Sequence, residues 1–82
     1  MTPVPQLLRS FAVPRREPLE QLPGVRKAIR QVESELGDEG RVLVRWSGTE
    51  NKLRVMVECL DASRLEEYVG RIQARALKEL GG

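Results

Sequence analysis

The sequence predicts an α+β fold, in which two helices cover one face of an antiparallel sheet. Three observations indicate this fold: two stretches with apolar residues three and four positions apart, two Val-rich runs on either side of a polar bend, and a short apolar run near the start. The first pattern is typical of amphipathic helices and the other two are typical of strands. The order strand, helix, strand, strand, helix favours a single sheet with both helices packed against it.

The first strand is predicted over residues 7–13, "LLRSFAV". Leu7, Phe11 and Val13 share one face, although Arg9 interrupts the alternation. The sequence "PRREP" ends the strand, because proline cannot continue a ladder of hydrogen bonds.

Residues 1–6 are expected to form an inter-domain linker or tail, and residues 7–82 to form the domain. Pro3 and Pro5 fix their own φ angles and push the residues before them towards extended backbone.

Two helices follow from stripes of apolar side chains. Pro23 suits the first turn of the earlier helix and Gly37 suits its end. Its stripe comprises Val25, Ala28, Ile29, Val32 and Leu36. Asp61 can cap the later helix, whose stripe comprises Leu65, Tyr68, Val69, Ile72, Ala76 and Leu80.

A hairpin is predicted from residues 41–46 and 53–58. If Trp46 lies opposite Leu53, one face of the hairpin becomes wholly apolar, and a slip of one residue would destroy that face. Arg45 then lies opposite Arg54 on the other face. Trp46, Tyr68 and Cys59 are expected to be core residues, because each continues an apolar face.

Composition excludes several kinds of chemistry. A chain of 82 residues forms one small domain. It has no histidine and a single cysteine, which excludes His-based triads, zinc clusters and an internal disulfide. The net charge of +2 predicts no general affinity for nucleic acids or membranes. Because the first residues do not have the pattern of a signal peptide, we expect a cytoplasmic location.

The bend of the hairpin gathers donors for an anion. Arg45, Ser47, Gly48, Thr49 and Arg54 lie within ten positions. Two opposed guanidinium groups destabilise a sheet by about 0.2 to 1 kcal/mol, so an anion or a nearby carboxylate should offset their repulsion. Arginine and glycine-containing turns are suited to phosphate. A solvated edge that discourages aggregation remains the alternative on these residues alone.

The run "GRVLVRWSGTENKLRVMVE", residues 40–58, resembles the C-terminal phosphate-binding segment of the α-D-phosphohexomutase superfamily, and within it the bacterial phosphoglucosamine mutases. In that family an R-x-S-G-T-E-P loop precedes an arginine and a stretch like RVMVE. The segments "PVPQLL" and "ELGDEG" and the closing helix are similar too, so the likeness covers nearly the whole chain. One departure is Asn51-Lys52, where the family usually has proline.

The resemblance implies the fourth domain of such an enzyme, with a TATA-binding-protein-like fold. It assigns the substrate phosphate to Arg45, Ser47, Gly48, Thr49 and Arg54, with Glu50 and Asn51 as supporting residues. It implies no catalytic residue and no metal or cofactor in this domain. A phosphoserine and a magnesium-binding aspartate loop are expected in other domains, since the two aspartates here, Asp38 and Asp61, sit at predicted helix boundaries.

The whole enzyme would interconvert glucosamine 6-phosphate and glucosamine 1-phosphate, towards UDP-N-acetylglucosamine and cell-wall synthesis. The implied partners are a phosphosugar and the other domains of the enzyme. Two alternatives stay open: the C-terminal domain of a phosphomannomutase or phosphoglucomutase, and a stand-alone RNA-binding module. The second needs exposed aromatic residues for base stacking, and this chain has only Phe11, Trp46 and Tyr68.

Overall fold

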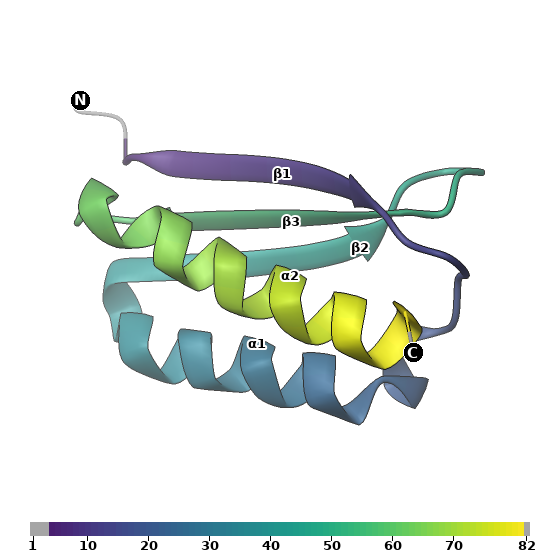
Figure 1. Ribbon diagram of the computed structural model, residues 1–82. Helices are drawn as coiled ribbons and strands as arrows, with labels where there is room; N and C mark the ends of the chain where they lie inside the picture. The colour runs from purple at the N-terminus through teal and green to yellow at the C-terminus, as the bar shows by residue number, and fades with distance from the viewer. Residues whose placement is uncertain (1–3, 82) are drawn as a thin grey trace.

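Two helices cover one face of a three-stranded antiparallel sheet in the computed structural model, which describes residues 4–81 (Figure 1). This confirms the predicted α+β fold. The elements are β1 (Gln6–Ala12), α1 (Pro23–Leu36), β2 (Gly40–Trp46), β3 (Lys52–Cys59) and α2 (Leu65–Gly81). Short 3-10 helices lie at Leu19–Gln21, Gly37–Glu39 and Ala62–Arg64. The strand order is β1-β3-β2, so the last strand of the chain lies at the centre of the sheet.

The hairpin has the predicted register. Trp46 pairs with Leu53 and Arg45 pairs with Arg54. Leu53 is fully buried, as are Val55 and Val57, which β3 also turns towards the helices, and Cys59 at the end of the strand is buried, as predicted. Their partners on β2 and Trp46 itself are only partly buried, because β2 is an edge strand.

Strand β1 begins and ends one residue earlier than predicted, and it pairs antiparallel with β3. Val13 was predicted to lie in the strand but follows it. Val13 is nevertheless buried, and its amide donates to the Asn51 carbonyl at 2.9 Å. Half of the predicted tail, residues 1–3, lies outside the described residues. The carbonyl of Pro5 accepts a hydrogen bond from the Cys59 amide at 3.1 Å, so pairing with the sheet extends to Pro5.

Arg9 interrupts the apolar face of β1 because it has partners on α2. Its Nη2 atom donates to both carboxylate oxygens of Glu66 at 2.8 and 2.7 Å, and its Nη1 atom donates to Gln73 at 3.1 Å. A half-buried guanidinium is tolerated when it is paired in this way.

The helices lie side by side and run in opposite directions (Figure 1). All six residues of the stripe predicted for α2 are buried, and four of the five predicted for α1 are buried, while Ile29 is partly buried. Gly37 ends α1 with φ 58°, a left-handed conformation that favours glycine. Asp61 caps the short helix that leads into α2 by accepting from the Ser63 amide at 3.1 Å.

The start of α1 is capped from the end of α2. The Glu79 carboxylate accepts hydrogen bonds from the amides of Gly24 at 2.8 Å and Val25 at 2.7 Å. These amides have no partner within the helix, and a negative charge there is favoured by the helix dipole. A Cβ atom at position 24 would lie 2.8 Å from Cδ of Glu79 and 2.8 Å from Cδ of Arg75, so a side chain there would displace these two side chains from the start of α1.

Candidate functional site

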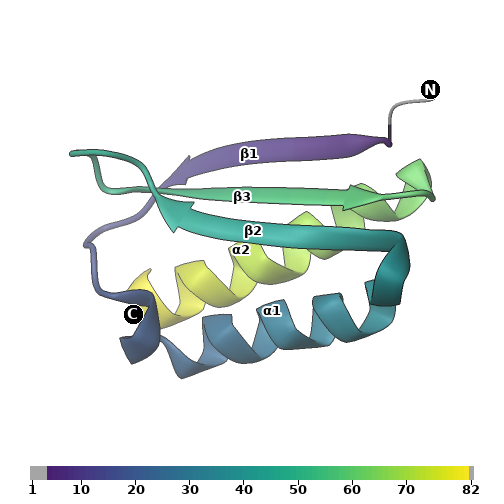
Figure 2. The ribbon, with the colours of Figure 1, turned by 180° about the vertical axis from the view of Figure 1, so that it is seen from behind.

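The loop between β2 and β3 projects from one end of the sheet, and the connection from β1 to α1 passes the same end (Figure 2). Side chains alternate along each strand, so the face without helices carries rows that cross all three strands. One row consists of Ser10, Arg54 and Arg45, and the next consists of Leu8, Met56 and Leu43. The first of these rows lies nearer the loop and carries two charges of the same sign.

Arg45 and Arg54 are both exposed, and neither makes an ion pair or a side-chain hydrogen bond with any residue of the described range 4–81. Arg41, on the same face of β2, differs because it pairs with Glu58 at 3.0 Å. Glu50 does not neutralise the two arginines either, since its carboxylate lies 3.3 Å from Nζ of Lys52. Two guanidinium groups therefore remain available for an external anion.

The loop borders a shallow hollow of about 450 Å³. Four of the predicted phosphate-binding residues line it, together with Glu50, Lys52 and one residue that the sequence did not indicate, Ser10: the full set is Ser10, Ser47, Gly48, Thr49, Glu50, Lys52 and Arg54. Ser10 joins the hollow because it is paired with Arg54 across the sheet. Only the pairing of β1 with β3 reveals that neighbour.

Arg45 lines a second hollow, of about 210 Å³, on the same sheet face. It shares Arg54 with the first, and its floor is apolar, formed by Leu8, Leu43 and Met56. Asn51, predicted as a supporting residue, lines neither hollow, and its carbonyl accepts the hydrogen bond from Val13. The arginine pair thus lies between a polar hollow at the loop and an apolar hollow over the sheet.

The loop also offers backbone donors. The Ser47 amide donates to the Lys52 carbonyl at 3.0 Å and closes the base of the loop. Among residues 4–81, the amides of the next four residues, Gly48 to Asn51, donate to no protein atom. Free amides in a turn form concave sites for anions, and guanidinium groups beside them strengthen such a site.

Gly48 is not required by the conformation of the loop itself. Its φ angle is not positive, and a Cβ atom added there would meet nothing within 4 Å. A glycine in such a place leaves room for a ligand to approach the backbone closely.

Acid–base chemistry is not indicated at this loop. The pKa of Asp61 is lowered chiefly by the hydrogen bond from the Ser63 hydroxyl, and the pKa of Arg71 is raised chiefly by its hydrogen bond to Glu35. Both residues lie outside the loop and its hollows. The arrangement is suited to binding an anion and holding it in place.

The described residues hold no group of three or more His, Cys, Asp or Glu side chains that could bind a metal ion. Nor does any helix within residues 4–81 have the length and apolar character needed to cross a membrane.

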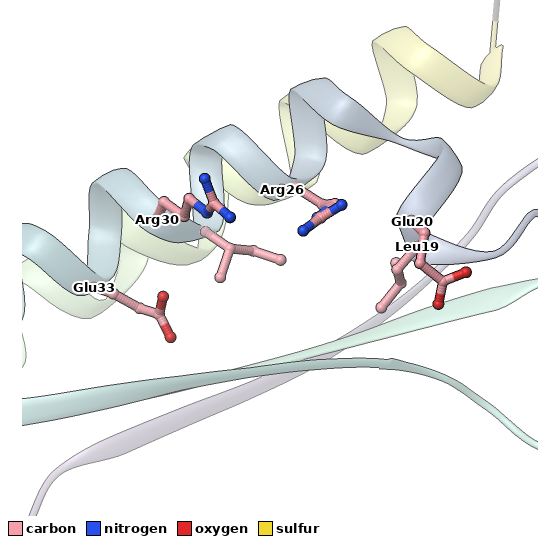
Figure 3. A pocket seen from close by; sticks show the side chains of 6 residues that line it. Leu19, Glu20, Arg26, Arg30 and Glu33 are labelled. Carbon is pink, nitrogen blue, oxygen red and sulfur yellow. The ribbon is translucent and has the colours of Figure 1, made fainter.

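Another groove, of about 330 Å³, lies beside α1 and the short helix before it (Figure 3). Leu19 and Ile29 form the apolar part of its lining. The charged part carries both signs and consists of Glu20, Arg26, Arg30 and Glu33. An anion would meet carboxylates there, so this groove does not rival the hairpin loop as a phosphate site.

The family model of the phosphoglucomutase/phosphomannomutase C-terminal domain matches residues 8–75. The chain belongs to this family. The match includes all three strands nearly in full, the loop from Ser47 to Asn51, and both Arg45 and Arg54. Membership in the phosphoglucomutase/phosphomannomutase family therefore covers every residue of the predicted phosphate site.

Curated relatives carry the name phosphoglucosamine mutase. The protein from Anaeromyxobacter sp. (strain Fw109-5) is 51% identical over 79 residues, which are 96% of this chain and 17% of that relative. The protein from Sorangium cellulosum (strain So ce56) is 45% identical over 82 residues, 100% of this chain and 17% of that relative. The protein from Chlamydia felis (strain Fe/C-56) is 48% identical over 77 residues, 94% and 17% respectively. The chain therefore spans about a sixth of the length of these relatives.

Solved structures of phosphohexomutases have the same fold. The crystal structure of Aspergillus fumigatus N-acetylphosphoglucosamine mutase in complex with GlcNAc-6P and magnesium superposes with a TM-score of 0.76 at 24% identity, covering 96% of this chain and 16% of that one. A second structure of the same enzyme gives a TM-score of 0.74 at 24% identity, with the same coverage. The architecture of a phosphohexomutase C-terminal domain is thus present in this chain.

Proposed function

We propose that this chain is the substrate-phosphate-binding domain of a phosphoglucosamine mutase, and that its ligand is glucosamine phosphate. The names of the relatives at 45 to 51% identity support this assignment. The observation that carries it is the pair of opposed arginines, Arg45 and Arg54, beside a loop with free amides.

An anion between the arginines removes their mutual repulsion and gains charge-assisted hydrogen bonds. Arg45 and Arg54 supply the guanidinium groups, Ser47 and Thr49 supply hydroxyls, and Gly48 allows close approach to the backbone. A bond to a charged group contributes about 1.5 to 3 kcal/mol when it is shielded from water. Arginine is better suited to phosphate than lysine because its planar fork binds two oxygens at once.

The apolar hollow next to the arginine pair is suited to the sugar. It shares Arg54 with the polar hollow and is floored by Leu8, Leu43 and Met56. A hexose whose phosphate lies at the loop would place its ring over this sheet face. This sheet face would contact only one side of the sugar ring. Other parts of the enzyme would contact the rest of the sugar.

A mutase needs this grip because its substrate must be held at the phosphate that is not reacting. The reaction moves a phosphoryl group between the 6- and 1-positions of glucosamine through a bisphosphorylated intermediate, towards UDP-N-acetylglucosamine. Holding one end fixes the other end in line for reaction. We place the enzyme in the cytoplasm, where sugar phosphates of this kind are made and used.

Magnesium and a phosphoserine belong to parts of the enzyme outside this chain in our proposal. The A. fumigatus structure was determined with magnesium. Residues 4–81 of this chain offer no fitting cluster of ligands, so no metal-dependent step is assigned to them. Their contribution is binding and orientation of the substrate.

The RNA-binding alternative has less support. Phe11 and Trp46 are partly buried against the core and Tyr68 is fully buried, so the exposed sheet face carries none of the three aromatic side chains. Base stacking requires such side chains on that face. A phosphomannomutase or phosphoglucomutase domain would use the same loop, and the names of the relatives favour glucosamine.

A titration followed by NMR tests the proposal. Inorganic phosphate and glucosamine 6-phosphate should each shift the amide signals of residues 47–51 with a Kd of about 1 mM, which corresponds to about −4 kcal/mol. Glucosamine without phosphate is the matched control and should leave these signals in place. If they do not move at about ten times that concentration of either phosphate compound, the chain does not bind the substrate phosphate.

A further inference from the structure

We propose that Arg16 is a positioning residue for the phosphate loop, and that it acts by turning the loop carbonyls away from the anion. This inference rests on the proposed function. It concerns a residue outside the hairpin, in the connection between β1 and α1, which the loop sequence does not indicate.

Arg16 is bound to the loop from the side. Its Nη1 atom donates to the Gly48 carbonyl at 2.7 Å and to the Glu50 carbonyl at 3.3 Å. Three residues earlier in the same connection, the Val13 amide donates to the Asn51 carbonyl. Three of the loop's carbonyl oxygens are therefore held by one segment of chain.

These bonds determine where the loop amides point. All peptide bonds of the described residues are trans, and in a planar trans peptide the carbonyl and the following N–H point in opposite directions. With the Gly48 and Glu50 carbonyls directed at Arg16, the amides of Thr49 and Asn51 point away from it. Both amides are among those that donate to no described protein atom.

Trp46 shows which side of the hairpin Arg16 occupies. The Arg16 guanidinium carbon lies 5.4 Å from the centre of the Trp46 ring, and the Trp46 indole N–H donates to the Glu17 carbonyl at 2.7 Å. Trp46 is on the helix-facing side of β2, whereas its neighbour Arg45 is on the opposite side. Arg16 therefore lies on the side of the sheet opposite to Arg45 and Arg54.

The consequence is a division of the loop's dipoles. The carbonyl ends of the Gly48–Thr49 and Glu50–Asn51 peptide groups face Arg16 on the helix side, and their N–H ends point away from it, towards the side of the two arginines. A phosphate at the arginine pair then meets the N–H groups of Thr49 and Asn51 and is kept from the Gly48 and Glu50 carbonyl oxygens, which would repel it. Because this orientation exists before binding, the ligand does not have to order the loop.

The test compares Arg16→Ala with Arg15→Ala in the full 82-residue chain. Arg15 is the neighbouring exposed arginine, and its side chain contacts Glu17 and the Glu79 carbonyl but no loop residue. Each substitution removes one positive charge from the same connection, so the pair separates the bracing of the loop from net charge. Far-UV circular dichroism and the dispersion of amide signals establish that both variants are folded.

Two readouts are needed to separate ordering of the loop by Arg16 from direct binding of phosphate by Arg16. In the free protein, heteronuclear NOE values of residues 48–51 should fall in Arg16→Ala and stay at the wild-type level in Arg15→Ala. The Kd for inorganic phosphate should rise about fivefold to tenfold in Arg16→Ala only, which corresponds to about 1 to 1.4 kcal/mol.

The positioning role is overturned if the wild type binds phosphate and Arg16→Ala binds it equally well. It is also overturned if affinity falls while the free loop stays as ordered as before, or if both variants weaken binding to the same extent. If the wild type itself does not bind phosphate, the proposed function is contradicted. This is a different result, so the wild type is measured before either variant.

Discussion

Arg45 lies directly opposite Arg54 across the β2–β3 pair, on the sheet face that no helix covers. Neither guanidinium group has an acidic partner among residues 4–81, whereas Arg41, four residues earlier on the same strand face, has Glu58. The sheet tolerates this arrangement at a small cost in stability, and in our proposal a bound anion removes the repulsion between the two groups.

Replacing either arginine should therefore separate binding from stability. Arg45→Ala or Arg54→Ala should raise the Kd for phosphate by about tenfold or more, because one charge-assisted contact is lost. The free energy of unfolding should stay the same or rise by a few tenths of a kcal/mol, because like charges no longer face each other. Isothermal titration calorimetry and urea denaturation measure the two quantities.

Arg41→Ala is the matched control for these variants. It removes the same charge from the same face of β2 but at the end away from the loop. Its phosphate affinity should stay near the wild-type value. Equal weakening by all three substitutions would mean that overall charge, and not the pair beside the loop, attracts the anion.

Glu79 lies in α2 but caps the start of α1, so replacing it should destabilise a helix that is distant in the sequence. Glu79→Ala should lower the free energy of unfolding by about 1 to 2 kcal/mol, because two amides at the start of α1 lose their acceptor. Glu67→Ala removes another α2 carboxylate, one that forms exposed ion pairs with Arg64 and Arg71. It should cost less than about 1 kcal/mol, and a larger loss than for Glu79 would contradict the capping role.

The two faces of the hairpin predict losses of stability of different size for the same substitution. Leu53 is fully buried on the central strand, so Leu53→Ala should cost about 2 to 5 kcal/mol. Leu43 is 49% exposed on the uncovered face, so Leu43→Ala should cost about 0.5 kcal/mol or less. Chemical denaturation of both variants measures the difference, and similar losses would show that the assigned register is incorrect.

Asp61 predicts a pH dependence on the acid side. Its pKa is below the ordinary value of 3.8, chiefly because the Ser63 hydroxyl and then the Ser63 amide donate hydrogen bonds to its carboxylate. A lowered pKa in the folded state means that the carboxylate's contribution to stability is present above pH 3.8 and is lost as the pH falls through the folded pKa.

Titration of the Asp61 side-chain carbon by NMR measures this pKa directly. In Ser63→Ala the pKa should move up towards 3.8, since the largest cause of the shift is removed. A wild-type pKa at or above that value would contradict the hydrogen-bonded cap.

Sequence patterns predicted those parts of the fold that depend on the alternation or periodicity of apolar residues. The hairpin register followed from the single pairing that makes one face apolar, and the α2 stripe matched its six buried residues. Arg9 could not be interpreted from the sequence, because its partners, Glu66 and Gln73, come from α2. Contacts between distant segments depend on packing that no local pattern contains.

For the same reason, some residues of the candidate site could be predicted from the sequence and others could not. The hairpin carries its five predicted residues within one short stretch, so a motif is enough to find them. Ser10 joins them only through the pairing of β1 with β3, and Arg16 reaches the loop only because the β1–α1 connection passes that end of the sheet. The role of each predicted residue in phosphate binding stays a prediction until the variants are measured.

The position of β3 at the centre of the sheet has a consequence for synthesis on the ribosome. Strand β1 is made first but pairs only with β3, and β2 likewise waits for β3. Until that strand emerges, the nascent chain holds two apolar strands without partners, and the cap of α1 is absent until Glu79 follows. Long-range pairing of this kind slows folding, and until it is complete the unpaired strand edges are prone to aggregation. The domain should therefore acquire its fold late, in one cooperative step after most of its residues have left the exit tunnel.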